Sequence, residues 1–382
     1  MGLRLNELRP VFVIGIGLHR YQSPSETSYV TLGLEAVRAA LADARIEWPC
    51  VESVYVAKAR LPMAPGRPML RHLGTTGVEI VHVENASASG SAAFRQACIE
   101  VACGMTDVSL AIGVDKALET GRAERITGIA QLADDAIVPF THYALLADEY
   151  ARRARINVQD IALVALKNHA NGALNPFAQR QQARTLDEIL GGRSISGSLT
   201  SLQCTPVGEG GAAVIVASEI GARQAGIDLT RMIRVTASAA RSQKVDDSAS
   251  SFDAVLTRDT VAQALQQAGI HPRQLDVIEL HDAFTVEELE YIEAIGLCGE
   301  GQAVNALKDG AFHIGGECAV SASGGLIAMG HPIGPTGLGQ VAEIVRQLRG
   351  EAGPRQHPDA HIGLAHMVGV GAVCYAHVLQ RQ

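Results

Sequence analysis

One short stretch of this sequence has the form of a loop that presents a nucleophile. Residues 83–90 read VENASASG and lead into SAAFRQACIEVAC, a run of small residues with helical character. The beginning of a helix favours a nucleophile, because its unpaired backbone N–H groups stabilise negative charge. The reactive side chain in this loop would be that of Ser87. A serine hydroxyl is hard to deprotonate, so this chemistry requires a well-placed base.

The elements that must position this loop follow a repeated order. VFVIGIG at 11–17 is typical of a buried strand, and a helical pattern and the strand-like VESVYVAK follow it. The same order returns in IRVTASA, TVAQALQQAGI and LDVIELHD. Leu41 aligns with Leu265, Ala44 with Ala268 and Ile46 with Ile270 at one constant offset of 224 residues. We interpret this as a duplicated unit.

A second pair of segments supports the duplication. SASGGLIAMGHPIG leads into the helical LGQVAEIVRQLRG and a strand, as VENASASG leads into its own helix and strand. We therefore expect an α/β protein in which two similar layers enclose two central helices of small residues. The N-terminal half would span 1–231 and the C-terminal half 232–382, with a loop or lid insertion at about 119–208.

These motifs together resemble the thiolase superfamily, and most of all its sterol-carrier-protein-x or lipid-transfer branch. The motifs that carry the resemblance are VENASASG at 83–90, KNHANGALNP at 167–176, HDAF at 281–284, GGLIAMGHPIG at 324–334 and AHMVGVG at 365–371. The resemblance implies a duplicated thiolase fold of five αβαβα layers, usually dimeric. It also implies an enzyme that makes or breaks a carbon–carbon bond on a coenzyme A thioester, with no permanently bound cofactor.

The resemblance also assigns roles to individual residues. Ser87 falls on the nucleophilic cysteine of the family, and His331 on the histidine that activates it. His281 falls on the position that completes an oxyanion site, while the backbone N–H groups of Ser87 and Gly369 match a second one. His366 is a candidate for the same pocket, and Asp282 for orienting the loop.

A second catalytic cysteine of the family is missing at both positions where the resemblance would place it. One position is Ala283 and the other is Met367, while Cys374 lies within an apolar strand that is typical of a core. The chain therefore predicts an atypical active site without either family cysteine.

Composition excludes several other classes of function. The net charge is −8, and no run of basic residues indicates binding to nucleic acid. No apolar stretch is long enough to span a bilayer, and no secretory signal begins the chain, so we expect a cytoplasmic protein. The seven cysteines form no CxxC pair and the histidines form no HExxH motif, so we expect neither disulfides nor a bound metal.

Several interpretations remain open at this stage. Ser87 is a serine nucleophile, an ordinary helix N-cap residue, or the product of an engineered Cys-to-Ser exchange. The chain is an acyltransferase, a retro-aldolase acting on a β-hydroxyacyl-CoA, or a non-catalytic subunit that binds acyl-CoA. A homodimer is expected, and a separate zinc-ribbon and OB-fold protein is a candidate partner, because that branch often has one.

Overall fold

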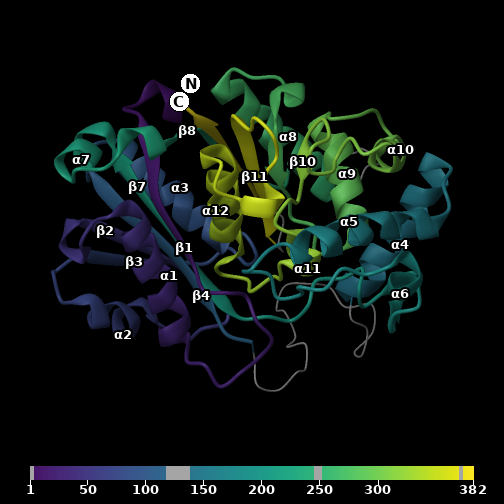
Figure 1. Ribbon diagram of the computed structural model, residues 1–382, viewed down its shortest axis with the longest axis horizontal. Coiled ribbons are helices and arrows are strands. Elements are labelled where there is room, and N and C mark those ends of the chain that lie inside the picture. Colours follow the sequence, from purple (N-terminus) through teal and green to yellow (C-terminus); the bar gives the residue numbers. More distant parts are fainter. Residues whose placement is uncertain (1–3, 118–137, 245–251, 370–372) are drawn as a thin grey trace.

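The computed structural model describes residues 4–117, 138–244, 252–369 and 373–382 (Figure 1). Residues 118–137, which include the first part of the predicted insertion, and residues 370–372, which include the end of the AHMVGVG motif, lie outside the described residues.

The elements of the N-terminal half alternate between strands and helices. They are β1 (Val11–Leu18), α1 (Tyr29–Ala44), β2 (Ser53–Ala57), α2 (Gly66–Leu70), β3 (Glu79–Val83), α3 (Ser89–Ala102), β4 (Val108–Asp115), β7 (Gly210–Ser218) and α7 (Glu219–Gln224).

The insertion between β4 and β7 is largely helical. It contains α4 (Val138–Ala154), α5 (Ala162–Ala173), α6 (Leu186–Leu190) and a small hairpin of β5 (Ser194–Ser196) and β6 (Leu199–Thr200).

The C-terminal half repeats the alternation with additional short helices. Its elements are β8 (Ile233–Ser242), α8 (Phe252–Ala268), β9 (Val277–Glu279), α9 (Thr285–Ile295), α10 (Ala303–Lys308), β10 (Ala319–Val320), α11 (Gly325–Ala328), α12 (Thr336–Arg349), β11 (Ile362–Gly369) and β12 (Val373–Arg381).

The two halves have the same sheet topology, as the sequence repeat predicts. The strands run in the order β3-β2-β4-β7-β1 in one half and β10-β9-β11-β12-β8 in the other. In both halves the first two ladders are parallel and the last two antiparallel. Strands β1 and β8 pair at Val11↔Val235, Phe12↔Arg234 and Val13↔Ile233, so the halves form one ten-stranded mixed sheet. Helices α1 and α8 end at Ala44 and Ala268, the residues matched by the offset of 224.

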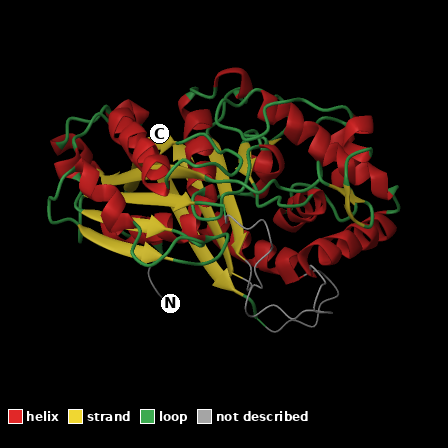
Figure 2. Cartoon of the chain, turned by 90° about the horizontal axis from the view of Figure 1, so that it is seen from below, coloured by secondary structure: helices red, strands yellow, loops and turns green. Residues whose placement is uncertain are grey.

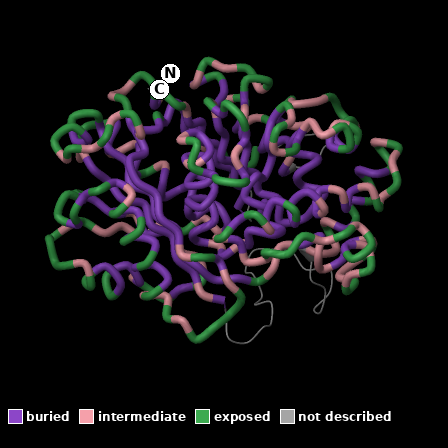
Figure 3. The backbone as a smooth tube through the Cα atoms, in the orientation of Figure 1, coloured by how far each residue is buried: buried purple, intermediate pink, exposed green. Residues whose placement is uncertain are grey.

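Alternating side chains of the buried strands create the layers. On β4, Leu110 and Ile112 point into the core beneath α1, whereas Ala111 points into the central core of α3 and α12. Helix α12 contacts strands of both halves, and α8 covers the C-terminal strands. The order of layers is α1, N-terminal strands, α3 with α12, C-terminal strands, and α8, which is the predicted five-layer arrangement. Figure 2 shows helices packed on the strands, and Figure 3 shows that the backbone of the central strands is mostly buried.

Small residues bring the two central helices together. A Cβ atom added to Gly337 would lie 2.6 Å from the backbone nitrogen of Ser91, closer than any side chain tolerates. The Gly and Ala content of these helices, which indicated close packing, therefore has a direct structural use.

The topology places the predicted catalytic residues after the carboxyl ends of parallel strands. Ser87 follows the parallel strand β3, His281 follows β9, and His331 lies in the connection after β10. The carboxyl ends of parallel strands are where α/β folds usually place their ligands. Ser87 and His331 thus come from equivalent connections of the two halves.

Candidate active site

The loop before α3 is held in an unusual backbone conformation that exposes Ser87 to the other half. Ala86 has a φ of 48°, in the left-handed region, which costs an alanine roughly 1 kcal/mol. Ser89 fixes this bend, because its hydroxyl donates to the Ala86 carbonyl at 2.7 Å and accepts from the Asn85 N–H at 2.9 Å. The N-cap residue of α3 is Ala88, without a side-chain cap, so Ser87 is not the N-cap.

The hydroxyl of Ser87 meets the imidazole of His331. Ser87 Oγ lies 3.0 Å from Nε2 of His331, and Nδ1 of the same ring lies 2.9 Å from Oγ1 of Thr336. The Thr336 hydroxyl donates its own proton to the carbonyl of Pro332 at 2.5 Å, so its oxygen must accept from Nδ1–H. This assignment leaves the lone pair of His331 on Nε2, where it accepts from the Ser87 hydroxyl.

His331 is poised as a neutral base. Burial, followed by repulsion from His281 and Arg60, holds the pKa of His331 well below its usual range. The imidazole is therefore uncharged near neutral pH, which is the form that accepts a proton.

His281 lies beside this pair but bonds in another direction. Its ring centroid is 5.5 Å from that of His331, in an edge-to-face arrangement. Its Nδ1 lies 3.2 Å from Oε1 of Glu287, which is buried in the first turn of α9. Its Nε2 is buried and has no partner in the described part of the chain.

Asp282 acts on the loop through its hydrogen bonds. Its two oxygens accept from the Leu326 N–H at 2.8 Å and from Nδ2 of Asn168 at 2.7 Å. Burial and the neighbouring Glu288 raise the pKa of Asp282 well above its usual value. The role of Asp282 in orienting the loop stays a prediction.

The KNHANG segment on α5 bonds to residues in and around the HDAF loop. Lys167 Nζ lies 3.0 Å from Oε1 of Glu288 and donates to the Val320 carbonyl at 2.6 Å. Two histidines of the insertion bond elsewhere. His169 on α5 is buried against the Leu202 carbonyl at 3.0 Å, and the ring of His142 on α4 packs against Tyr143.

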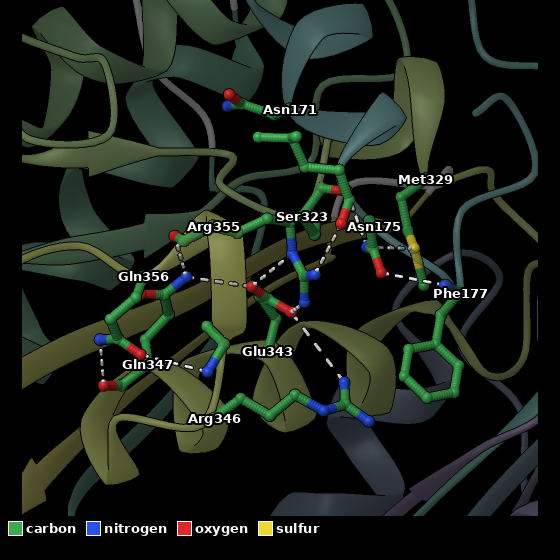
Figure 4. Close-up of polar contacts among 12 residues, drawn as sticks. Asn171, Asn175, Phe177, Ser323, Met329, Glu343, Arg346, Gln347, Arg355 and Gln356 are labelled. Carbon is green, nitrogen blue, oxygen red and sulfur yellow. Dashed lines mark hydrogen bonds and ion pairs between the residues drawn. The ribbon is translucent and has the colours of Figure 1, made fainter. Parts of the chain in front are cut away.

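A polar network anchors the lid and the strand-following loops behind the site (Figure 4). Asn175 donates through Nδ2 to the Ser323 carbonyl at 2.8 Å and accepts the Phe177 N–H at 3.0 Å. Arg355 and Glu343 form a buried ion pair with Nη2–Oε2 and Nε–Oε1 distances of 2.9 and 3.2 Å. These contacts hold the framework and touch neither Ser87 nor His331 directly.

Other predicted positions lie at different distances from the reaction centre. Gly369 ends β11 against the Ser87 loop, since an added Cβ there would lie 2.6 Å from the Asn85 carbonyl. His366 bonds Thr257 Oγ1 at 2.9 Å and packs against Tyr291, so its described contacts are with α8 and α9 rather than with Ser87.

The positions where a second thiol was sought hold apolar side chains in the core. Met367 packs with Ala88 and Tyr375 near the start of α3, and Ala283 is also buried. Cys374 is fully buried, as expected for a core residue, and burial raises its pKa to about 12.

Three residues of the site were not identified from the sequence. Glu287, Thr336 and Asp115 each fix one of its loops, and Asp115 does so by accepting the Gly334 N–H at 2.6 Å. Thr336 stands within the GHPIGPTG motif, and Glu287 lies six residues after His281, so both are close in sequence to a motif, although the motif does not show which atom they bond. Asp115 is 219 residues from Gly334, and no local pattern joins them.

Two further findings concern the whole described part. None of its helices is long and apolar enough to cross a membrane. Within the same residues, no group of three or more His, Cys, Asp or Glu side chains is arranged to hold a metal ion.

The duplicated topology, with its five layers and its mixed ten-stranded sheet, is that of a protein of thiolase type. The thiolase N-terminal domain model matches residues 16–190, and the thiolase C-terminal domain-like model matches 237–381. The chain belongs to the thiolase family.

Relatives and a solved structure agree with this membership. Human sterol carrier protein 2 is 33% identical over 95% of this chain and 70% of its own length. The benzoylsuccinyl-CoA thiolase subunit BbsB of Thauera aromatica is 32% identical over 95% of both chains. The structure of an Ltp2-ChsH2(DUF35) aldolase has a TM-score of 0.80 at 23% identity, covering 97% of this chain and 98% of that one.

The hydrogen bond that fixes the His331 tautomer gives one prediction. Thr336→Val removes the acceptor for Nδ1–H, so the imidazole loses its preferred orientation, and kcat for acyl transfer should fall roughly tenfold or more. Thr336→Ser keeps the hydroxyl and should retain most of kcat. Steady-state kinetics with saturating acyl-CoA separates the two variants, and equal losses in both would contradict the tautomer assignment.

The depressed pKa of His331 gives a second prediction. A base works in its unprotonated form, so kcat/KM should stay constant as pH falls through about 6.5, the ordinary histidine value, and decline only at lower pH. A pH profile of acyl transfer, with circular dichroism to verify that the fold persists, measures this. A half-loss at about pH 6.5 or above that disappears in a His331 variant would be inconsistent with a neutral base.

Proposed function

We propose that this protein is a thiolase-like acyltransferase that makes or breaks a carbon–carbon bond on a coenzyme A thioester. In this proposal Ser87 takes the place of the family cysteine and carries the acyl group, and His331 is its base. The observation that carries the proposal is the 3.0 Å contact between Ser87 Oγ and His331 Nε2, with Nδ1 committed to Thr336. The names of relatives such as benzoylsuccinyl-CoA thiolase support the thioester as substrate.

The acyl-transfer step follows from this geometry. Nε2 of His331 takes the hydroxyl proton as Ser87 Oγ bonds to the thioester carbonyl carbon. The carbon–sulfur bond then breaks, and the departing thiolate takes the proton back from His331 as free coenzyme A. The backbone N–H groups of Ser87 and Gly369 are the proposed donors to the transient oxyanion. No permanently bound cofactor enters the step.

The test is the intact mass of the protein after mixing with a panel of acyl-CoA thioesters, followed by peptide mapping. We expect one acyl adduct, on the peptide containing Ser87, and none in Ser87→Ala. Ser87→Cys should form the adduct faster, because a thiolate is accessible near neutral pH. If neither the native protein nor Ser87→Cys gains mass, the proposal fails.

A retro-aldolase is the second candidate. The buried apolar side chains at positions 283 and 367 favour it, because aldol cleavage needs an acid, a base and an oxyanion site but no second thiol. It predicts that both the native protein and Ser87→Ala cleave a β-hydroxyacyl-CoA, whereas the acyltransferase proposal predicts that neither does and that Ser87→Ala loses acyl transfer. Tight stoichiometric binding to a partner without turnover of either substrate would instead indicate a binding subunit.

We propose further that the chain works as a homodimer in the cytoplasm. In the described residues, the outer strand β3 pairs only with β2, and it leads directly into the Ser87 loop. A second copy covering this free edge would shield the loop. The similarity to the Ltp2-ChsH2(DUF35) aldolase also supports a search for a separate zinc-ribbon and OB-fold partner. The boundary between halves at 231 and 232 likewise remains our prediction.

A further inference from the structure

The imidazole of His281 presents an unused lone pair beside the Ser87–His331 pair. The residue is only 6% exposed, and its Nε2 has no partner among the described residues. A buried polar atom without a partner is costly, so it is expected to have a ligand in the working protein. The neighbouring ring of His331 indicates that this ligand is the substrate.

The other nitrogen of His281 is committed to Glu287. That carboxylate is 1% exposed, and it accepts the Phe284 N–H at 2.8 Å and the Tyr291 hydroxyl at 3.0 Å. Glu287 therefore accepts hydrogen bonds from both groups. We assign its third contact, at 3.2 Å, as a hydrogen bond donated by Nδ1–H of His281. In the neutral ring the lone pair must then be on Nε2. A neutral His281 is therefore a proton acceptor toward the site rather than an oxyanion donor.

We propose that His281, oriented by Glu287, is the general acid and base of the carbon–carbon bond step. This inference rests on the proposed function and replaces the missing second thiol with an imidazole. In the condensing direction, Nε2 takes a proton from the α-carbon of an acyl-CoA, and the freed electron pair forms the bond to the acyl carbon on Ser87. The ester bond to Ser87 breaks, and the proton held by His281 is the one that the released serine oxygen needs. Atoms and charges balance without another reactant.

The charged surroundings of His281 come from several elements. Glu287 and Tyr291 lie on α9 and His331 in the loop before α12, while Asp253 on α8, Tyr143 on α4 and His366 on β11 also belong to the cluster. Burial and Glu287 raise the pKa of Asp253 to about 7. A second carboxyl near the His281–Glu287 pair therefore exchanges protons near neutral pH. Its contact to the Tyr143 hydroxyl is 3.5 Å.

The test is exchange of α-protons for deuterium in saturated acyl-CoA thioesters in D₂O, followed by mass spectrometry. This exchange needs the base but not acyl transfer, so Ser87→Ala should lose acyl transfer and still exchange. His281→Gln should slow exchange by about 100-fold or more. Glu287→Gln, which keeps the shape but not the charge, should lower the exchange rate at saturating thioester while KM changes little.

His169→Gln is the matched control. His169 is also buried and also has one nitrogen without a partner, but its other nitrogen faces the Leu202 carbonyl in the lid. It should exchange as fast as the native protein. Native exchange rates in His281→Gln, or no exchange by the native protein with any thioester of the panel, would overturn the inference. If α-protons exchange but no acyl adduct forms on Ser87, only the proposal that Ser87 carries the acyl group is overturned.

Discussion

A His331→Gln variant is expected to lose about 10²- to 10⁴-fold of kcat/KM for acyl transfer, the usual contribution of a positioned base. Glutamine fills much of the same space and can bond Thr336, but its amide does not take the Ser87 proton. KM should change much less than kcat, because the ground-state contacts to coenzyme A would remain. Pre-steady-state release of coenzyme A measures the acylation step directly.

His377→Gln provides the matched control for this experiment. His377 is fully buried, and its Nδ1, like that of His331, lies close to a hydroxyl, Ser238 Oγ at 3.0 Å, but it lies on β12. We expect native kinetics from it. If His331→Gln keeps a native acylation rate while remaining folded, another group must deprotonate Ser87, and the assignment of the base is wrong.

Arg355→Met is expected to cost about 3–5 kcal/mol of unfolding free energy, because it removes both close guanidinium contacts of the buried Glu343 carboxylate and leaves it only the longer contact to Arg346 among its ion pairs in the described residues. Both side chains are almost completely buried, and their two contacts are of the bidentate kind (Figure 4). Arg355 also donates to the Leu174 carbonyl at 3.2 Å, so its loss loosens the lid as well. Urea unfolding followed by fluorescence or circular dichroism gives the free energy.

The chain offers its own comparison for this pair. Arg346 lies 3.9 Å from the same carboxylate but is more exposed, so Arg346→Met should cost clearly less. The double variant Arg355→Met with Glu343→Gln should recover part of the loss, because no buried charge remains unpaired. Equal costs for the two arginine substitutions would refute the importance of burial.

Much of the fold could be predicted, because its duplication produces similar sequence patterns in the two halves. The offset that aligned Leu41 with Leu265 coincides with matching helix ends, and the buried strands read as continuous apolar runs. The pairing of β1 with β8, which joins the halves into one sheet, was not predicted. It depends on contacts between segments more than 200 residues apart, for which periodicity carries no information.

The candidate site, too, could be predicted only in part. The resemblance of their motifs to those of the thiolase superfamily pointed to Ser87, His281 and His331. The sequence did not reveal that Thr336 and Glu287 decide which nitrogen of each imidazole holds a proton, since this is a matter of three-dimensional hydrogen bonding. Nor could it reveal the support of Asp282 by Asn168, which is 114 residues away.

The equivalent origins of Ser87 and His331 have a practical consequence. A cut between the halves would leave the hydroxyl on one polypeptide and its base on the other, and would strip each central helix of its neighbour. Neither fragment alone could carry out the reaction, but two fragments that reassociate would restore it. Recovered turnover would therefore serve as a quantitative reporter of reassembly, with a signal that comes from the natural chemistry rather than from an attached label.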